Sequence, residues 1–246
     1  AHRFRDWGLM PYWFRAVEKF CPWVRKIHFV TCGHVPGWLD LDCPKLNHVK
    51  HSDYIPAEYL PTFSANAIEM NIHRIPDLAE HFIYFNDDMY PVGRCEPEDF
   101  FSNGKAHIGY YRHLFASGMY KKICRNSDRM ARKALGLKKS PFFIRPQHIC
   151  SPMFRSLCEE ISSLSEEEVR KTSVSRTRTA DDLNQYLFLD YQYYKGRLIA
   201  KPVSNRHISV ALTSSSRLRK AILEPDGKML CVNDVRLSEE RYEVLR

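Results

Sequence analysis

Hydrophobic residues recur at helical spacing in two stretches of the N-terminal half of the chain. The first stretch predicts an amphipathic helix over residues 8–20. The second predicts a helix over residues 65–75, with Ser64 at the N-cap position and Pro76 at the end. The apolar positions are Leu9, Trp13, Val17 and Phe20 in the first helix and Ala65, Ile68, Ile72 and Ile75 in the second. Each helix therefore has one apolar face that can pack against a sheet.

Short runs of apolar and β-branched residues alternate with these helices. Ile27–Thr31 and Leu46–His51 predict two strands, separated by a turn-forming stretch from Gly33 to Pro44. A third strand is predicted immediately before Asp87. With the helix that precedes it, this strand completes a strand–helix–strand unit, for which we expect a parallel pair with a right-handed crossover.

The C-terminal half continues the alternation. Helices are predicted over residues 147–163 and 180–194, and strands near His207–Leu212 and Lys228–Val232. No internal repeat or low-complexity linker interrupts the chain. The pattern predicts one α/β domain spanning residues 1–246.

Composition indicates a compact protein. The chain has 246 residues, of which 44% are hydrophobic and 13% aromatic, so a sizeable core is expected and disorder is not. No apolar run approaches the length of about 20 residues that crosses a bilayer. The eight cysteines contain no Cys-x-x-Cys pair, which argues against a zinc cage or a disulfide framework. We expect reduced thiols in a cytoplasmic protein.

Positive charge is concentrated in one segment. The net charge is +8, and residues 105–145 carry many lysines and arginines against the single acid Asp128. Such a segment suits an anionic glycan, an acidic membrane surface or nucleic acid about equally, and a solvated helical face is the simpler interpretation. No RNA- or DNA-reading motif accompanies it, so a nucleic-acid partner is not expected. We predict a basic helical insertion over 104–145 that contacts the inner face of the membrane peripherally.

Asp87 and Asp88 follow the apolar strand that begins at His81, and they are the first candidates for chemistry. Ligands of open α/β sheets bind beyond the carboxyl ends of strands, and carboxylates there hold Mg²⁺ or Mn²⁺ against a diphosphate. The sequence Asn86-Asp87-Asp88 is also typical of a turn, because Asn and Asp side chains hydrogen-bond to their own backbone, and this is the alternative interpretation. Asp234 follows the apolar run 229–232 in the same way and is a third candidate metal ligand, although a lone Asp often serves as a cap or turn residue.

Two arginines and a histidine complete the candidate set. Arg176 and Arg178 are two residues apart, so an extended backbone would point both guanidinium groups to one side. Guanidinium groups match phosphoryl oxygens well. His148 lies at the start of a predicted helix, and its imidazole can accept a proton near neutral pH. Among eleven histidines any single one is more often structural.

These segments together resemble the Stealth family, which comprises bacterial capsular polysaccharide phosphotransferases and the catalytic subunit of an animal N-acetylglucosamine-1-phosphotransferase. The dense resemblance to the second conserved block covers about the first hundred residues. The third block is matched around His148 and from Thr172 to Arg178, and the fourth by Cys231-Val232-Asn233-Asp234. The second block is matched by Arg3-Phe4-Arg5-Asp6-Trp7, Pro22–Thr31, His51-Ser52-Asp53, Leu60–Ser64 and Phe85-Asn86-Asp87-Asp88.

The resemblance implies roles for particular residues. Arg178 would bind phosphate, His148 would be the general base, and Asp87, Asp88 and Asp234 would hold Mg²⁺ or Mn²⁺. Arg5, Asp6 and Ser64 are further candidates for substrate binding, together with Arg176. The family's first block does not appear in this sequence, which begins inside the second, so we expect it upstream.

The resemblance also implies a reaction and a fold. We expect a Rossmann-like or glycosyltransferase-A-like mixed sheet flanked by helices. The expected enzyme moves a hexose or N-acetylhexosamine 1-phosphate from a UDP-sugar to a glycan hydroxyl, releasing UMP, in capsule or exopolysaccharide synthesis. Two alternatives stay open: a metal-dependent glycosyltransferase that releases UDP, and a fragment that binds glycan or nucleic acid without chemistry.

Overall fold

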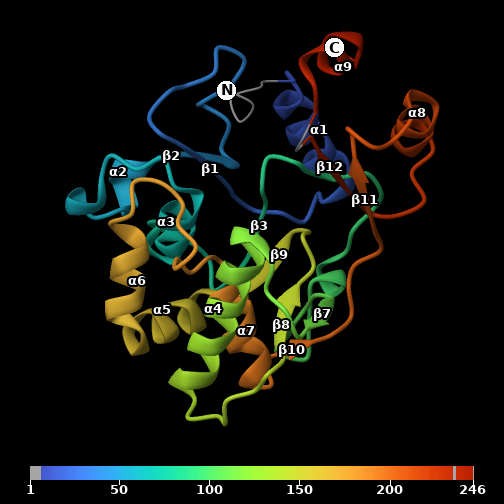
Figure 1. Ribbon diagram of the computed structural model, residues 1–246. Helices are drawn as coiled ribbons and strands as arrows, with labels where there is room; N and C mark the ends of the chain where they lie inside the picture. Colours follow the sequence, from blue (N-terminus) through green and yellow to red (C-terminus); the bar gives the residue numbers. More distant parts are fainter. Residues whose placement is uncertain (1–6, 235–236, 246) are drawn as a thin grey trace.

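A computed structural model describes residues 7–234 and 237–245. Figure 1 shows the order of the elements, with helices α3 to α7 in the lower left part and α1, α8 and α9 around the opposite end. The helices are α1 (Met10–Phe20), α2 (His51–Tyr54), α3 (Ala65–Met70), α4 (Gly118–Ala134), α5 (Arg155–Leu164), α6 (Glu166–Ser173), α7 (Tyr186–Tyr194), α8 (Ser215–Leu223) and α9 (Glu239–Leu245), with short 3₁₀ turns η1 (Ala57–Tyr59), η2 (Ile72–Arg74) and η3 (Pro97–Asp99). The strands are β1 (Ile27–Thr31), β2 (Leu46–Lys50), β3 (His81–Tyr84), β4 (Met89–Pro91), β5 (Phe101–Ser102), β6 (Lys105–His107), β7 (Tyr110–His113), β8 (Phe143–Pro146), β9 (Ser151–Phe154), β10 (Leu198–Ile199), β11 (Asn205–Ser209) and β12 (Met229–Asn233).

The described strands form several small sheets rather than one large one. β1 and β2 pair in parallel, as do β11 and β12, and β4 joins β12 antiparallel. β3 pairs antiparallel with β9, β7 with β8, and β6 lies between β5 and β10. The chain is therefore mixed α/β, as predicted, whereas the continuous sheet expected from a Rossmann-like or glycosyltransferase-A-like fold is replaced in the described residues by these small sheets.

Local patterns predicted most of the first half correctly. The helix over 8–20 and the strands over 27–31 and 46–51 are confirmed as α1, β1 and β2. The helix over 65–75 is shorter, because α3 ends at Met70 and the chain continues as η2. Ser64 occupies the N-cap position but makes no side-chain cap bond.

Three predictions about the middle of the chain were wrong. β3 does not pair in parallel within a strand–helix–strand unit; its described partner is β9, with Phe82 opposite Met153. The helix over 147–163 begins only at Arg155, because residues 151–154 are extended to pair with β3. The helix over 180–194 begins at Tyr186. Pairing of β3 with β9 is a long-range contact, which periodicity alone does not reveal.

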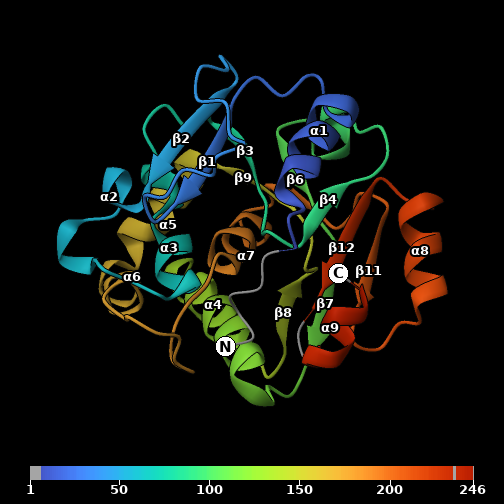
Figure 2. The same ribbon diagram turned by 90° about the horizontal axis from the view of Figure 1, so that it is seen from above.

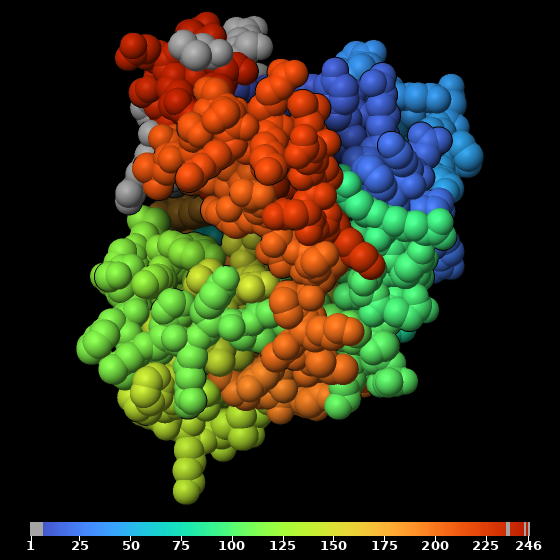
Figure 3. Space-filling model, turned by 90° about the vertical axis from the view of Figure 1, so that its right-hand side faces the viewer, coloured from blue at the N-terminus to red at the C-terminus, as the bar shows by residue number. Residues whose placement is uncertain are grey.

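The basic segment is built into the fold through α4. This helix packs against α7 and β8, and one face is buried at Ile123, Cys124 and Ala131. Asp128, the single acid of the segment, is buried in the same interface. Figure 3 shows the orange and red C-terminal part stacked above the green segment around α4.

Two hydrophobic cores hold the molecule together. The larger one contains the strands β3, β8 and β9 and the helices α3 to α7, with α7 buried along most of its length. The smaller one lies under α8 and α9, where Ile208, Leu218 and Leu230 pack together. Figure 2 shows α8 flanking β11 at the opposite edge of the molecule from α2 and α6. No described helix combines the length and the apolarity needed to span a membrane.

Candidate active site

The two acidic residues that follow β3 lie in a tight turn leading into β4. The backbone N–H of Met89 donates to the carbonyl of Asn86, and the Tyr90 hydroxyl donates to the carbonyl of Asp87 at 2.9 Å. The backbone N–H of Val232 donates to the carbonyl of Asp88 at 2.8 Å, which ties the turn to β12. The prediction of a turn at Asn86-Asp87-Asp88 is thus confirmed. The turn places Asp88 next to β12.

Asp88 makes several side-chain contacts in the site, and one of its oxygens has no partner among the described residues. Its Oδ2 lies 3.2 Å from His148 Nε2 and accepts from Cys231 Sγ at 3.5 Å. Asn233 also hydrogen-bonds to it. Burial alone would raise the pKa of Asp88, but the bonds from His148 and these neighbours bring it below its usual value. Its Oδ1 is buried and has no hydrogen-bond partner in the described part of the chain.

Asp87 and Asp234 belong to the same acidic neighbourhood. Partial burial of the carboxyl group and the adjacent Asp88 charge raise the pKa of Asp87, although much of the residue's surface is exposed. Asp234 contributes to this rise as well, and its Oδ2 accepts a hydrogen bond from Trp7 Nε1 at 3.1 Å. The charges of Asp88 and Asp234 thus disfavour ionisation of Asp87, and a divalent cation near Asp87 would offset this effect.

His148 lies in a bend between β8 and β9, not at a helix start as its sequence context predicted. Its Nε2 faces Asp88, and its Nδ1 is 3.5 Å from the Tyr186 hydroxyl, which in turn is 3.0 Å from the Tyr120 hydroxyl. If Nε2 carries the proton and donates it to Asp88, then Nδ1 is the basic nitrogen and faces the tyrosines.

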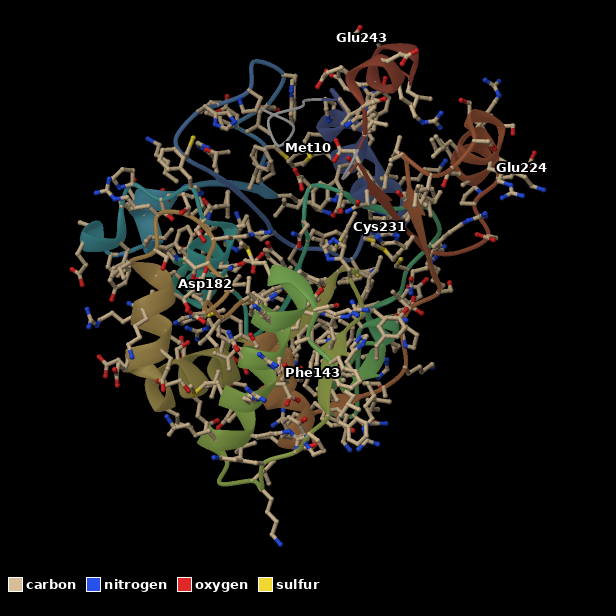
Figure 4. All side chains as sticks on the ribbon, in the orientation of Figure 1. Met10, Phe143, Asp182, Glu224, Cys231 and Glu243 are labelled. Atoms are coloured by element: carbon tan, nitrogen blue, oxygen red, sulfur yellow. The ribbon has the colours of Figure 1, made fainter. Side chains whose placement is uncertain are left out.

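A cavity of about 220 Å³ joins His148 to Arg178. The first turns of α4, the middle of α3 and the segment before α7 also line it. Figure 4 shows Asp182 and Cys231 on the two sides of the region above α4. The lining residues are Asn66, Glu69, Asn86, Met119, Tyr120, Ile123, His148, Arg178, Asn184, Gln185 and Tyr186.

Three polar atoms of residues that line this cavity have no hydrogen-bond partner in the described part of the chain. Asn86 Oδ1, Arg178 Nε and Gln185 Oε1 are buried and find no hydrogen bond within the described residues. A buried polar atom without a partner is costly, so three of them lining one cavity indicate a site that a polar ligand completes.

The segment that carries Arg178 is anchored at both ends. Before it, the Arg176 carbonyl accepts from the backbone N–H of Phe63 at 2.9 Å. After it, Asp182 accepts from the backbone N–H and the hydroxyl of Thr179, and from Asn66 Nδ2 at 3.0 Å. These bonds hold Arg178 against α3 and the cavity wall.

The other predicted substrate-binding residues are placed differently. Arg176 is exposed, and it is not among the residues that line the cavity. The extended segment expected to point both arginines one way is a loop with bends. Ser64 is fully buried, and its hydroxyl has no partner in the described structure. Arg5 and Asp6 lie outside the described residues.

Glu69 is the main cavity residue that sequence reasoning missed. It is 4% exposed, accepts from the backbone N–H of Gln185 at 3.2 Å, and lies near the Tyr84 hydroxyl. Burial raises its pKa, while the hydrogen bond from Gln185 and the charge of Arg178 oppose the rise. The available signal was the helical spacing of Asn66 and Glu69, two polar residues three apart on the cavity face of α3.

The structure also assembles a mixed group of potential metal ligands. One ligand atom each from Asp88, His148 and Cys231 lies within 4.8 Å of the others. Burial raises the pKa of the Cys231 thiol, which keeps it protonated and makes it a poor ligand. Asp88, whose Oδ1 is unpartnered, is the member of this group that suits a hard cation.

Comparison with known proteins identifies relatives. The profile of Stealth protein CR2, conserved region 2, matches residues 3–108. A receptor polysaccharide phosphotransferase, WefC, of Streptococcus oralis is 37% identical over 263 residues, covering 94% of this chain and 79% of that protein. A capsular polysaccharide phosphotransferase, WcwK, of Streptococcus pneumoniae is 33% identical over 261 residues, with the same coverage. Another, CpsJ of Streptococcus thermophilus, is 44% identical over 147 residues, or 58% of this chain and 62% of that protein.

Proposed function

Because the chain belongs to the Stealth family and its relatives are polysaccharide phosphotransferases, we propose that it transfers a sugar 1-phosphate from a UDP-sugar to a glycan hydroxyl, releasing UMP. The glycan product is a phosphodiester-linked polysaccharide of the capsular type. The observation that carries the proposal is that His148 and Arg178, distant in sequence, line one cavity with unpartnered polar atoms, and that Asp88 contacts His148 beside it.

His148 and Asp88 would activate the acceptor. With Nε2 held by Asp88, His148 Nδ1 takes the proton of the acceptor hydroxyl as its oxygen attacks the β-phosphorus. The bond between the β-phosphorus and the oxygen bridging to the α-phosphate then breaks, and that oxygen leaves with UMP. The sugar keeps its own bond to the β-phosphate throughout.

Arg178 would carry the charge on the phosphoryl oxygens. Its Nε is buried without a partner in the described structure and lies on the cavity wall. The first turn of α4, with Met119 and Tyr120, lines the same cavity, so the positive end of a long helix also faces it. Electrostatic stabilisation of this kind is the main catalytic contribution that a protein makes to phosphoryl transfer.

Asp87, Asp88 and Asp234 would hold Mg²⁺ or Mn²⁺. The Asp88 Oδ1 has no partner in the described residues, and the charges of Asp88 and Asp234 raise the pKa of Asp87. Both features fit a hard divalent cation. When bound, such an ion neutralises the diphosphate and the leaving phosphate.

The mouth of the site also supports a peripheral membrane contact. Leu114, Phe115 and Met119 are exposed where β7 leads into α4, and Lys122 is exposed one turn later. Apolar side chains flanked by lysines suit an anionic bilayer surface. Phe115→Asp should therefore weaken cosedimentation with anionic vesicles, and unchanged cosedimentation would contradict this contact.

Identification of the released nucleotide tests the reaction class. The protein is incubated with a UDP-sugar, Mg²⁺ and a glycan acceptor, and the nucleotide is separated by chromatography. The proposal predicts UMP in amounts equal to the phosphodiester formed. Release of UDP with a plain glycosidic product would assign the site to a glycosyltransferase.

A further inference from the structure

A second cavity lies between η2, α5 and α6, away from Asp88 and His148. Its volume is about 430 Å³, larger than that of the central cavity. Figure 1 shows α5 and α6 together at the lower left, below α3. The lining residues are Tyr59, Asn71, His73, Arg74, Glu159, Ser162, Ser163, Glu166, Val169, Arg170 and Ser173.

Two side chains lining this cavity are more than nine-tenths buried and have unpartnered polar atoms. His73 is 6% exposed, and its Nδ1 has no hydrogen bond within the described residues. Ser162 is 9% exposed, and its hydroxyl also has no hydrogen bond to a described residue. The His73 ring is held edge-on to Phe188 at 5.8 Å. Burial lowers the pKa of His73 to about 4, so at neutral pH its ring is uncharged and can donate or accept one hydrogen bond. Buried polar atoms of this kind are normally paired, which indicates a polar ligand.

The charges around the cavity favour a neutral ligand. Arg74 and Arg170 are balanced by Glu159 and Glu166, so the lining has no net positive charge to attract a phosphate. Donors, acceptors and serine hydroxyls are all present, and Tyr59 supplies an aromatic face. A polyhydroxylated, uncharged molecule matches this mixture better than an anion or a hydrocarbon.

The second cavity is linked structurally to the central one. Glu69 of α3 lines the central cavity, and Asn71, two residues later, lines the second. Asn71 Nδ2 donates to the Ser173 hydroxyl at 3.1 Å, and Ser173 ends the helix from which the chain runs on to Arg178. The same two segments therefore form walls of both cavities.

We infer that this second cavity binds a neutral sugar of the glycan acceptor, remote from the hydroxyl that reacts. The inference rests on the proposed function, because it names part of the acceptor of that reaction. Such a subsite would favour long acceptors over short ones through added binding energy, without contributing groups to the chemistry.

A bulky residue at the mouth of the second cavity tests this inference. Ser163 is exposed and lines the cavity, so Ser163→Trp obstructs it without disturbing the core. Leu164→Trp, one residue further and outside the lining, adds the same ring as a matched control. We expect Ser163→Trp to raise KM for a hexasaccharide acceptor by about tenfold, which corresponds to about 1.4 kcal/mol, and to leave KM for a monosaccharide acceptor and for the donor unchanged. Equal effects on both acceptors, or an equal effect of Leu164→Trp, would overturn the inference.

A binding experiment separates failure of this inference from failure of the proposed function. Neutral oligosaccharides of galactose, glucose and N-acetylhexosamines are titrated into the protein, and the ¹⁵N signals of the His73 ring are followed by NMR. The inference predicts a shift of the Nδ1 signal that Ser163→Trp abolishes, whether or not transfer is observed. A His73 signal that responds to inorganic phosphate and to none of the oligosaccharides would overturn it.

Discussion

Two carboxylates, Asp88 and Asp128, occupy contrasting environments. Asp128 is 1% exposed in the interface of α4 with α7 and β8, and both its oxygens are paired. Its Oδ1 accepts from the Tyr194 hydroxyl at 2.6 Å and from the backbone N–H of Ile144 at 3.1 Å, and its Oδ2 accepts from Arg132 at 3.1 Å. Asp88 uses only Oδ2, and its buried Oδ1 has no partner in the described residues.

This difference separates a structural carboxylate from a functional one. The bonds of Asp128 to Tyr194 and Ile144 run between elements of the fold, and the bond from Arg132 lies within α4, so all three contribute to stability. Asp88 contacts His148 with one oxygen, its other oxygen has no partner in the described residues, and His148 lines a cavity with further unpartnered atoms. Charge alone, which the two residues share, would not distinguish them, and the Asp88 side chain is 19% exposed against 1% for that of Asp128.

The largest expected effect is on turnover by Asp88→Asn. The substitution keeps the size of the side chain and removes its charge, so both the orientation of His148 and cation binding suffer. We expect a loss of turnover on the order of a hundredfold or more, with little change in the free energy of unfolding. Normal turnover with an unaltered dependence on Mg²⁺ concentration would show that Asp88 has no catalytic role.

Asp190, a third buried carboxyl, sharpens the comparison because neither of its oxygens has a partner in the described structure. Burial, followed by the charge of Asp128, raises the pKa of Asp190 well above its usual value. A folded-state pKa above the unfolded one contributes stability at low pH, and this contribution is lost as the pH rises toward the folded-state pKa. The loss amounts to about 1.4 kcal/mol for each pH unit in that range.

Asp190→Asn removes this titration. The free energy of unfolding of the variant, relative to the original protein, should therefore rise between pH 5 and pH 7. Urea unfolding at the two pH values measures it. Parallel pH dependences of the two proteins would show that Asp190 titrates normally in the folded state.

Asp128→Asn should produce the reverse of the result at Asp88. Asparagine retains one acceptor but loses charged hydrogen bonds to Arg132 and Tyr194, so we expect the free energy of unfolding to fall by about 2 kcal/mol. Turnover per folded molecule should stay within about twofold of that of the original protein. A rise of about 1.4 kcal/mol in the activation free energy would lower turnover tenfold, so a twofold limit excludes such a rise. A large fall in turnover without a fall in stability would invalidate the distinction between the two carboxylates.

Arg178→Lys should have a smaller effect, with Arg176→Lys as its matched control. Lysine keeps the charge of Arg178 but loses the planar fork, which should lower kcat/KM about tenfold, as expected for one charge-assisted hydrogen bond of about 1.5 kcal/mol. Arg176 is exposed outside the cavity, so its substitution should have little effect. Equal losses at both positions would restore the prediction that the two arginines act together.

The sequence predicted those parts of the fold that local patterns determine. β1 and β2 have the predicted residues almost throughout, because alternating apolar residues and flanking turns define them. Residues 151–154 were predicted as helix and are a strand, because their partner β3 is about seventy residues away in the sequence. Periodicity carries no information about such pairing.

The site was predictable only as a set of residues. Asp88 and His148 were both predicted, and the structure adds that they contact each other and that Nδ1 of His148 faces the cavity. The roles of Asp87, Asp88 and Asp234 as metal ligands stay predictions. The residue pattern alone did not distinguish Arg176 from Arg178. The direction of a side chain in a loop depends on anchoring bonds such as those of Asp182, which the sequence does not reveal. Glu69 was missed because the apolar residues Ile68 and Ile72 on either side of it predicted a helix whose role is to pack against the sheet.

The most direct test of the central claim follows one oxygen atom. A UDP-sugar is labelled with ¹⁸O at the oxygen that bridges the anomeric carbon and the β-phosphorus. It is incubated with the protein and a glycan acceptor, and the masses of the products are measured by mass spectrometry. Attack at the β-phosphorus leaves the bond from that oxygen to the sugar intact, so the account predicts the label in the glycan product and none in the nucleotide. Label recovered in released UDP would mean attack at the anomeric carbon and would contradict the account.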